Sequence, residues 1–230
     1  MRKQNYSYVG ITFVLLVFGI IFIPKIISRI KGEQIVDLDR HNLDHAAPNN
    51  VAMAIIGPAP EFALTDQNGA LFSSAQLKDQ VYVVEFFFTT CPSICPIMTQ
   101  NLLKVQSAFG DELGLSLISI TINPAYDTPE VLSDYAQKYG ITHPNWHLLT
   151  GAQEEIYEMA NKGFNLYVGP GAEIDGGFEH SGFFALIDQK GMIRSRHDQY
   201  GNPIIYYDGL EVGQVSKLIN DISVLLREKS

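Results

Sequence analysis

The sequence predicts an α/β fold for residues 58–230 of this 230-residue chain. Two apolar segments, 81–88 and 115–122, are rich in β-branched and aromatic residues and have the length of buried parallel strands. A helical pattern follows each of them, at 96–109 and 129–139, so strands and helices alternate along the chain. This length is sufficient for one domain with a substantial core.

Residues 1–31 are predicted to form a membrane signal anchor. From Val9 to Ile23 the chain is apolar or small except for Thr12, and basic residues flank both ends. An uncleaved anchor is favoured over a cleaved signal peptide, because no A-x-A site follows at the usual distance. Residues 32–57 contain many Asp and Asn residues without periodicity, and are therefore predicted to be a linker.

Turn and capping residues predict the other elements. Gln67-Asn68-Gly69 separates short strands at 62–64 and 70–72, which indicates an N-terminal β-hairpin. Thr128 and Pro129 are suited to the N-cap and first residue of the helix at 129–139. We also expect a helical turn at 74–77, a strand at 146–149, a helix capped by Thr150 and ended by Gly163, a hairpin of strands 183–188 and 192–196, and a helix at 212–227.

This order is that of a thioredoxin-like fold with an N-terminal β-hairpin extension, preceded by the single transmembrane helix. In such open α/β sheets, ligands collect at the carboxyl ends of the parallel strands. Cys91 and Cys95 follow the carboxyl end of the strand at 81–88. The strand at 183–188 should run antiparallel beside it, which brings the preceding His180 to the two cysteines.

Cys91 and Cys95 are the two cysteines of the chain, in a C-x-x-x-C arrangement. On a helix, residues four apart have Cβ atoms about 5–6 Å apart, whereas a disulfide needs about 3.5–4.5 Å. Pro96 indicates a helix that begins near itself, which leaves Cys91 in a loop and Cys95 at the helix start. A helix N-terminus favours the thiolate, the form that binds metals or attacks disulfides. Metal binding, disulfide chemistry and an inert buried pair are the alternatives.

Two thiolates and one imidazole, from Cys91, Cys95 and His180, would make a three-ligand metal site. Soft thiolates favour Cu(I), and imidazole suits copper in either oxidation state. A structural zinc site usually has four protein ligands, and Asp127 or a water could complete one. Met98 is expected to pack in the core. The remaining candidates are expected at loops or strand edges and comprise His143, His147 and His197.

Three stretches of the chain resemble the Sco/SenC family of copper proteins: 88–96 with both cysteines, 121–132, and 180–188 beginning at His180. The resemblance extends over about 57–230 and implies a thioredoxin-like domain. It also implies that Cys91, Cys95 and His180 bind one copper ion, as Cu(I) or Cu(II). Asp127 lies in the second stretch and is expected to shape the site as a hydrogen-bond acceptor.

The family resemblance further implies a metallochaperone that assists assembly of the copper A centre of cytochrome c oxidase. Its partners would be the copper A subunit, and another copper chaperone or a thiol reductant. With the anchor, this predicts a single-pass protein of the bacterial inner membrane whose C-terminal domain lies in the periplasm. The family often has an acid between the cysteines, where this chain has Ser93 and Ile94.

An enzymatic function is the alternative. Cys91 and Cys95 could form a disulfide and exchange it with a partner, as a thiol-disulfide oxidoreductase that reduces the copper A cysteines. The C-x-x-x-C spacing is one residue longer than the C-x-x-C redox motif, and simple exchange does not require His180. These two observations favour metal handling.

Charge excludes one class of partner. Residues 32–230 contain eleven Lys and Arg against 25 Asp and Glu, a formal net charge of −14. So acidic a domain repels phosphate backbones, and we therefore expect no nucleic-acid binding.

Overall fold

The computed structural model describes residues 16–20, 22–23, 52–171 and 177–228. Residues 16–20 and 22–23 are helical, while the rest of the predicted anchor and most of the predicted linker lie outside the described residues. Within the described part of the chain, no helix combines the length and hydropathy needed to cross a bilayer. The described residues from 52 onward belong to one compact unit.

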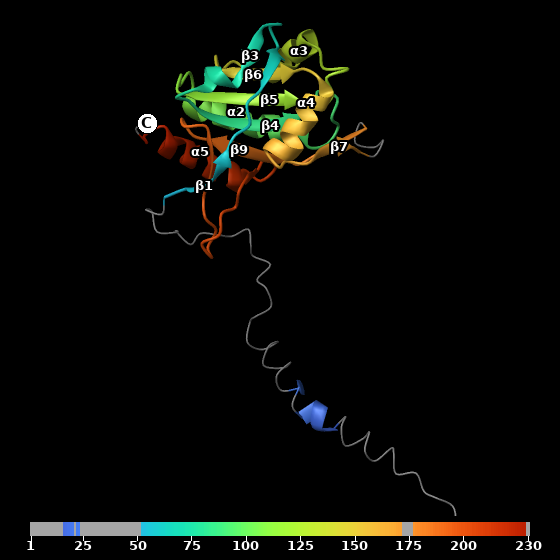
Figure 1. Ribbon diagram of the computed structural model, residues 1–230, viewed down its shortest axis with the longest axis vertical. Helices are drawn as coiled ribbons and strands as arrows, with labels where there is room; N and C mark the ends of the chain where they lie inside the picture. The colour runs from blue at the N-terminus through green and yellow to red at the C-terminus, as the bar shows by residue number, and fades with distance from the viewer. Residues whose placement is uncertain (1–15, 21, 24–51, 172–176, 229–230) are drawn as a thin grey trace, which may run out of the picture. The chain divides into compact units, whose positions relative to one another are not determined.

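A mixed β-sheet forms the centre of this unit (Figure 1). Its middle consists of β4 (Val81–Phe87), β5 (Leu115–Thr121) and β6 (Trp146–Thr150), which run parallel. β9 (Phe183–Ile187) pairs antiparallel with the other edge of β4, as expected, and β10 (Met192–Ser195) pairs with β9. The α/β order and the antiparallel neighbour of β4 are those of the predicted thioredoxin-like fold.

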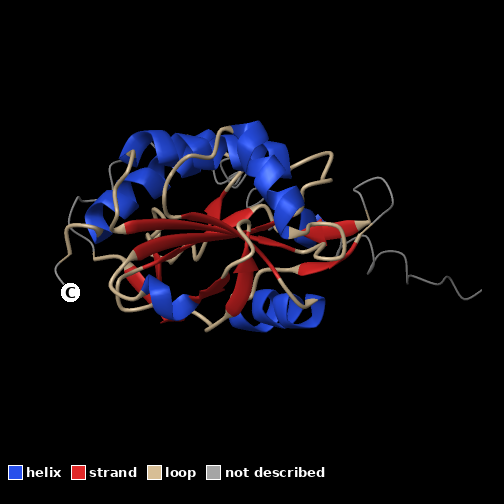
Figure 2. Ribbon diagram, turned by 90° about the horizontal axis from the view of Figure 1, so that it is seen from above, coloured by secondary structure: helices blue, strands red, loops and turns tan. Residues whose placement is uncertain are grey.

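Helices cover both faces of this sheet (Figure 2). Every residue of β4 and β5 is buried, which explains why their sequences are almost continuously apolar instead of alternating. α4 (Gln153–Glu158) lies on the face opposite to α2 (Cys95–Phe109) (Figure 1). The remaining helices are α3 (Pro129–Tyr139) and α5 (Val212–Leu225).

The capping residues of α3 are those that the sequence predicts. The Thr128 hydroxyl accepts a hydrogen bond from the Val131 backbone N–H at 3.4 Å, and Pro129 is the first residue. Gly140 ends the helix with φ of 73°, a left-handed conformation that glycine adopts without strain. α2 ends at Gly110 as expected.

The N-terminal hairpin is also confirmed. β2 (Ala63–Asp66) pairs with β3 (Leu71–Ser73), and β2 joins the sheet beside β6. The Asp66 carboxylate accepts hydrogen bonds from the backbone N–H groups of Asn68 and Ala70, which fixes the turn. The helical turn η1 (Ser74–Leu77) follows.

The predicted cap of α4 is wrong. Thr150 is the last residue of β6, where Thr65 of β2 pairs with it, and Ala152 occupies the N-cap without a side-chain hydrogen bond. The helical region also changes character before Gly163, because Met159–Gly163 forms a π-helix (η2). A threonine before acidic residues resembles a cap, but the ladder to β2 extends the strand through it.

Four short strands are absent from the sequence prediction. β1 (Ala54–Pro58) pairs with β10, so the last residues of the predicted linker belong to the sheet. β7 (Val168–Pro170) pairs with β8 (Phe178–His180), and β11 (Tyr207–Asp208) pairs with β9. Each is too short, or too rich in glycine and proline, to show a periodicity of its own.

Candidate metal centre

The turn between β4 and α2 carries both cysteines. The Cys91 backbone N–H donates to the Phe88 carbonyl at 3.2 Å, which closes a turn directly after the strand. Cys95 is the first residue of α2 and Pro96 the second, so the proline occupies a position where no intrahelical N–H donor is needed. The prediction of a loop cysteine followed by a helix-start cysteine is confirmed.

His180 arrives from the opposite side of the site, at the end of β8. Val168 of β7 pairs with it across the two-stranded sheet. The ring lies edge-on to Phe88, with centroids 5.9 Å apart. Nδ1 lies 3.2 Å from the Ser181 carbonyl oxygen, and Nε2 lies 3.1 Å from Cys95 Sγ. A carbonyl can only accept, so Nδ1 carries the proton and the Nε2 lone pair faces the sulfur.

Cys91, Cys95 and His180 therefore converge, although 85 residues separate Cys95 from His180. One donor atom from each residue lies within 4.8 Å of the others, and all three residues are buried. Donors that share an ion at about 2.0–2.3 Å lie roughly 3.5–4 Å apart. Small side-chain adjustments would thus allow the three atoms to hold one metal ion.

The two thiols have different electrostatic environments. A hydrogen bond from Cys95 lowers the pKa of the Cys91 thiol far below its ordinary value. The Cys95 backbone N–H, at the start of α2, also points at Cys91 Sγ at 3.4 Å. Burial, followed by the neighbouring Cys91, raises the pKa of Cys95. Cys91 is thus the thiolate of the metal-free pair, and Cys95 holds the proton.

Asp127 does not belong to the cluster but supports the turn that carries it. Its carboxylate is fully buried and accepts a hydrogen bond from the Thr89 backbone N–H at 3.1 Å. The hydroxyls of Thr89 and Thr121 also donate to it. Asp127 thereby ties the loop after β5 to the start of the cysteine turn, two residues before Cys91.

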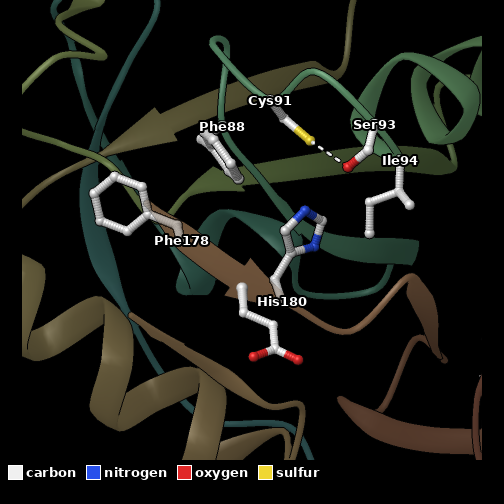
Figure 3. Close-up of a pocket in the computed structure, with 7 residues that line it drawn as sticks. Phe88, Cys91, Ser93, Ile94, Phe178 and His180 are labelled. Carbon is white, nitrogen blue, oxygen red and sulfur yellow. Dashed lines mark hydrogen bonds between the residues drawn. The ribbon is translucent and has the colours of Figure 1, made fainter. Parts of the chain in front are cut away.

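A small open cavity of about 170 Å³ lies beside Cys91. Its lining includes the apolar side chains of Phe88, Phe178 and Ile94, together with Cys91 and His180 (Figure 3). Ser93 and Glu179 complete the lining, whereas Cys95 is not part of it. The cavity therefore gives access to the Cys91 sulfur and the His180 imidazole, whereas Cys95 is almost completely buried.

The other sequence candidates lie elsewhere. Met98 is completely buried in the hydrophobic core, as expected. His143 precedes β6 in a loop, His147 lies within β6 against Phe72, and His197 forms an isolated bridge with Pro203. In the described part of the chain, the metal-type cluster consists of Cys91, Cys95 and His180.

The sequence did not reveal the carbonyl of Ser181 or the walls of the cavity. The carbonyl oxygen is a backbone atom, so its residue type carries no signal. Phe178 and Glu179 precede His180 directly, and their adjacency to a candidate ligand was the available clue. Their place in the cavity depends on the pairing of β7 with β8, which the sequence pattern does not show.

The fold and the cluster together define a thioredoxin-like domain with a Cys-Cys-His site of metal-binding type. Residues 56–211 match the sequence profile of the SCO1/SenC family, and the chain belongs to that family. The SCO2-like protein RT0576 of Rickettsia typhi is 36% identical over 134 residues. That alignment covers 56% of this chain and 64% of the relative, slightly less than two thirds of its length.

Two solved structures extend the comparison over most of the domain. BsSco, described with a disulfide switch and as a member of the Sco family of cytochrome c oxidase assembly proteins, is 28% identical with a TM-score of 0.64. The alignment covers 76% of this chain and 97% of BsSco. Yeast Sco1 with copper bound is 28% identical with a TM-score of 0.55, over 75% and 92% of the two chains.

Proposed function

We propose that this chain is a copper metallochaperone that binds one copper ion through Cys91, Cys95 and His180. We further propose that it serves the assembly of the copper A centre of cytochrome c oxidase. The observation that carries the proposal is the convergence of the three donor atoms within 4.8 Å. Membership of the SCO1/SenC family and the copper-bound yeast relative support the choice of metal.

The donor set suits copper better than the hard cations. Two sulfurs favour Cu(I), while a neutral imidazole accommodates both oxidation states. The Ser181 carbonyl holds the proton on Nδ1 of His180, which leaves Nε2 free to coordinate. Zinc would usually require a fourth protein ligand, and Asp127, the candidate from the sequence, is occupied with Thr89 and Thr121.

Transfer requires an entrance for the ligands of the acceptor. The cavity beside Cys91 and His180 is open and largely apolar, so an incoming side chain can approach the ion from that side. Ligand exchange would then begin at Cys91, while the more deeply buried Cys95 releases the ion last. A site of three ligands leaves a coordination position for this exchange.

The proposed setting is the outer face of the bacterial inner membrane. The apolar segment at 9–23 would anchor the chain, and the linker would hold the domain in the periplasm. The copper A subunit is the proposed acceptor. A second copper chaperone would supply the metal, or a thiol reductant would keep both cysteines reduced.

The test is anaerobic titration of the reduced full-length protein with Cu(I), followed by measurement of bound copper. The wild-type protein should bind one equivalent. Cys91→Ser and Cys95→Ser should lose stoichiometric binding, because each removes one of two thiolates, and His180→Ala should weaken binding at least about tenfold. His197→Ala, which removes an imidazole outside the cluster, should have no effect. Full copper affinity in both cysteine variants would contradict the proposal.

A thiol-disulfide reductase is the second candidate, because Cys91 is an activated thiolate beside a second thiol. The Cys91 thiolate would attack a partner disulfide to form a mixed disulfide and release one partner thiolate. Cys95, after losing its proton, would attack Cys91 Sγ, releasing the second partner thiolate and leaving a Cys91–Cys95 disulfide. The chain loses two electrons and the proton of Cys95, and the two partner thiolates become thiols by taking up one proton released from Cys95 and one from water.

The two functions differ in their need for His180. Reduction of a disulfide peptide by the metal-free protein can be followed in wild type and in His180→Ala. If the metal-free wild type reduces the peptide rapidly and the variant does so equally well, while binding copper poorly, reductase chemistry is the main function. Slow reduction by both proteins, with tight copper binding by the wild type, favours the metallochaperone.

A further inference from the structure

A buried hydrogen-bond path joins the helix of the cysteines to the loop of the histidine behind the metal centre. It begins at Asn101 of α2, six residues after Cys95 and only 3% exposed. The Asn101 side-chain amide donates to the Gly209 carbonyl at 2.7 Å. The Gly209 backbone N–H in turn donates to the Gly182 carbonyl, also at 2.7 Å. Gly182 is two residues after His180.

The middle of this path, residues 207–209, is closely packed. An added Cβ on Gly209 would lie 2.8 Å from the Phe184 ring and 2.9 Å from the Gly182 carbonyl oxygen. Tyr207, at the start of the segment, is fully buried and pairs with Phe184 of β9. Because residues 207–209 are closely packed, a displacement of α2 should also displace the loop at 181–182.

The path ends next to the atom that sets the tautomer of His180. The Gly182 peptide follows the Ser181 carbonyl, and that carbonyl accepts from His180 Nδ1–H at 3.2 Å. Holding the Gly182 carbonyl restricts the neighbouring Ser181–Gly182 peptide, and thereby favours the orientation of the Ser181 carbonyl that directs His180 Nε2 toward Cys95 Sγ at 3.1 Å. The other end of the path is rigid, since Asn101 and Cys95 belong to the same helix.

We propose that Asn101 is a positioning residue of the metal centre, which acts through Gly209 and Gly182 to hold His180 against Cys95. The inference rests on the proposed copper site. Asn101 touches none of the three ligands, and its second side-chain bond is the one that Oδ1 accepts from Lys104 at 2.8 Å.

The test is a double-mutant cycle on the full-length protein, with Cu(I) affinity as the measurement. Asn101→Leu should weaken copper binding about tenfold, the effect of one buried hydrogen bond together with the carbonyl left without a donor. In the His180→Ala background the same substitution should change affinity less than twofold, because the residue that Asn101 positions has gone. An equal loss in both backgrounds would mean that Asn101 supports the helix generally, and would overturn the proposal.

A second variant separates loss of the hydrogen bond from a general disruption of the fold. Asn101→Asp retains the size and the contact with Lys104, which keeps the new carboxyl ionised, so that it has no proton to donate to Gly209. It should weaken copper binding as Asn101→Leu does. The matched control is Asn145→Leu, which removes an amide that donates to Leu113 and Leu115 at the amino end of β5. It should lower stability without changing copper affinity.

A metal-free measurement separates this proposal from the proposed function. Long-range ¹H–¹⁵N spectra of the His180 imidazole should report the Nδ1–H tautomer in the wild-type protein and a mixture of tautomers in Asn101→Asp. An unchanged tautomer in Asn101→Asp would refute the positioning role, whether or not the protein binds copper. Absence of copper binding by the wild type, with the tautomer shift present, would refute only the proposed function.

Discussion

At the scale of single residues, Glu85 is the least expected side chain of the core. It is the one charged residue of β4 and is 1% exposed. Ser119 donates to one carboxyl oxygen at 2.7 Å, and Trp146 donates to the Ser119 hydroxyl at 3.0 Å. The other oxygen, Oε2, has no hydrogen-bond partner among the described residues. Burial raises the pKa of Glu85 to about 8, against the opposing effect of the Ser119 bond.

This raised pKa predicts how Glu85→Gln changes stability with pH. An unfolded chain ionises Glu85 above about pH 4.5, whereas the folded protein keeps the proton until about pH 8. Folded wild type therefore loses stability as pH rises through this window. The gain from Glu85→Gln should be small at pH 4.5 and reach the order of several kcal/mol at pH 8. Denaturant unfolding of both proteins across this range measures it.

An exposed carboxylate provides the control for that prediction. Glu155→Gln removes a charge from the surface of α4, and we expect its effect to stay within about 0.5 kcal/mol across the same range. A gain from Glu85→Gln that did not grow with pH would show that the Glu85 carboxyl is ionised in the folded protein.

At the scale of secondary-structure elements, the loops after β4 and β5 form one unit around Asp127. Three donors converge on this carboxylate, which is why the turn before Cys91 is fixed. The sequence suggests Asp127 either as a hydrogen-bond acceptor that shapes the site or as a fourth zinc ligand, and the structure shows it as an acceptor outside the metal cluster. It determines where the cysteine turn begins.

Asp127→Ala should therefore affect both stability and the metal centre. It leaves the Thr89 N–H and two hydroxyls without their acceptor, and should lower the free energy of unfolding by about 2–4 kcal/mol. Copper affinity should fall as well, because the turn that carries Cys91 is released. Thr128→Ala, which removes the cap of α3 one residue away, should reduce stability by only about 1 kcal/mol and leave affinity unchanged. Equal affinities for Asp127→Ala and wild type would contradict this role.

The same scale shows where sequence reasoning succeeds and where it stops. β4, β5, α2 and α3 were predicted within a residue or two, because continuous apolar runs and capping residues are local signals. β1 and β11 were not, since each is a short strand defined by its ladder to β10 or β9. β7 and β8 were not either, because each has only three residues and shows no periodicity of its own. The prediction that Thr150 caps α4 was wrong for a similar reason, because its pairing with Thr65 outweighs its local preference for a helix cap.

At the scale of the whole molecule, the residues of the metal centre are brought together by the topology of the sheet and not by proximity in sequence. The parallel arrangement of β4 and β5 presents the cysteine turn at their carboxyl ends, and antiparallel β9 brings its own beginning to the same edge. The convergence of His180 on the cysteines was thus predictable from the fold class. The path through Asn101 and Gly209 was not, because it joins residues 108 positions apart through a backbone carbonyl.

X-ray absorption spectroscopy of the Cu(I)-loaded, full-length protein tests the central claim most directly. We predict a first shell of two sulfur atoms and one nitrogen or oxygen atom in the wild type, and loss of the imidazole scattering in His180→Ala. A shell with fewer than two sulfurs, or imidazole scattering that persists in His180→Ala, would show that the copper lies elsewhere.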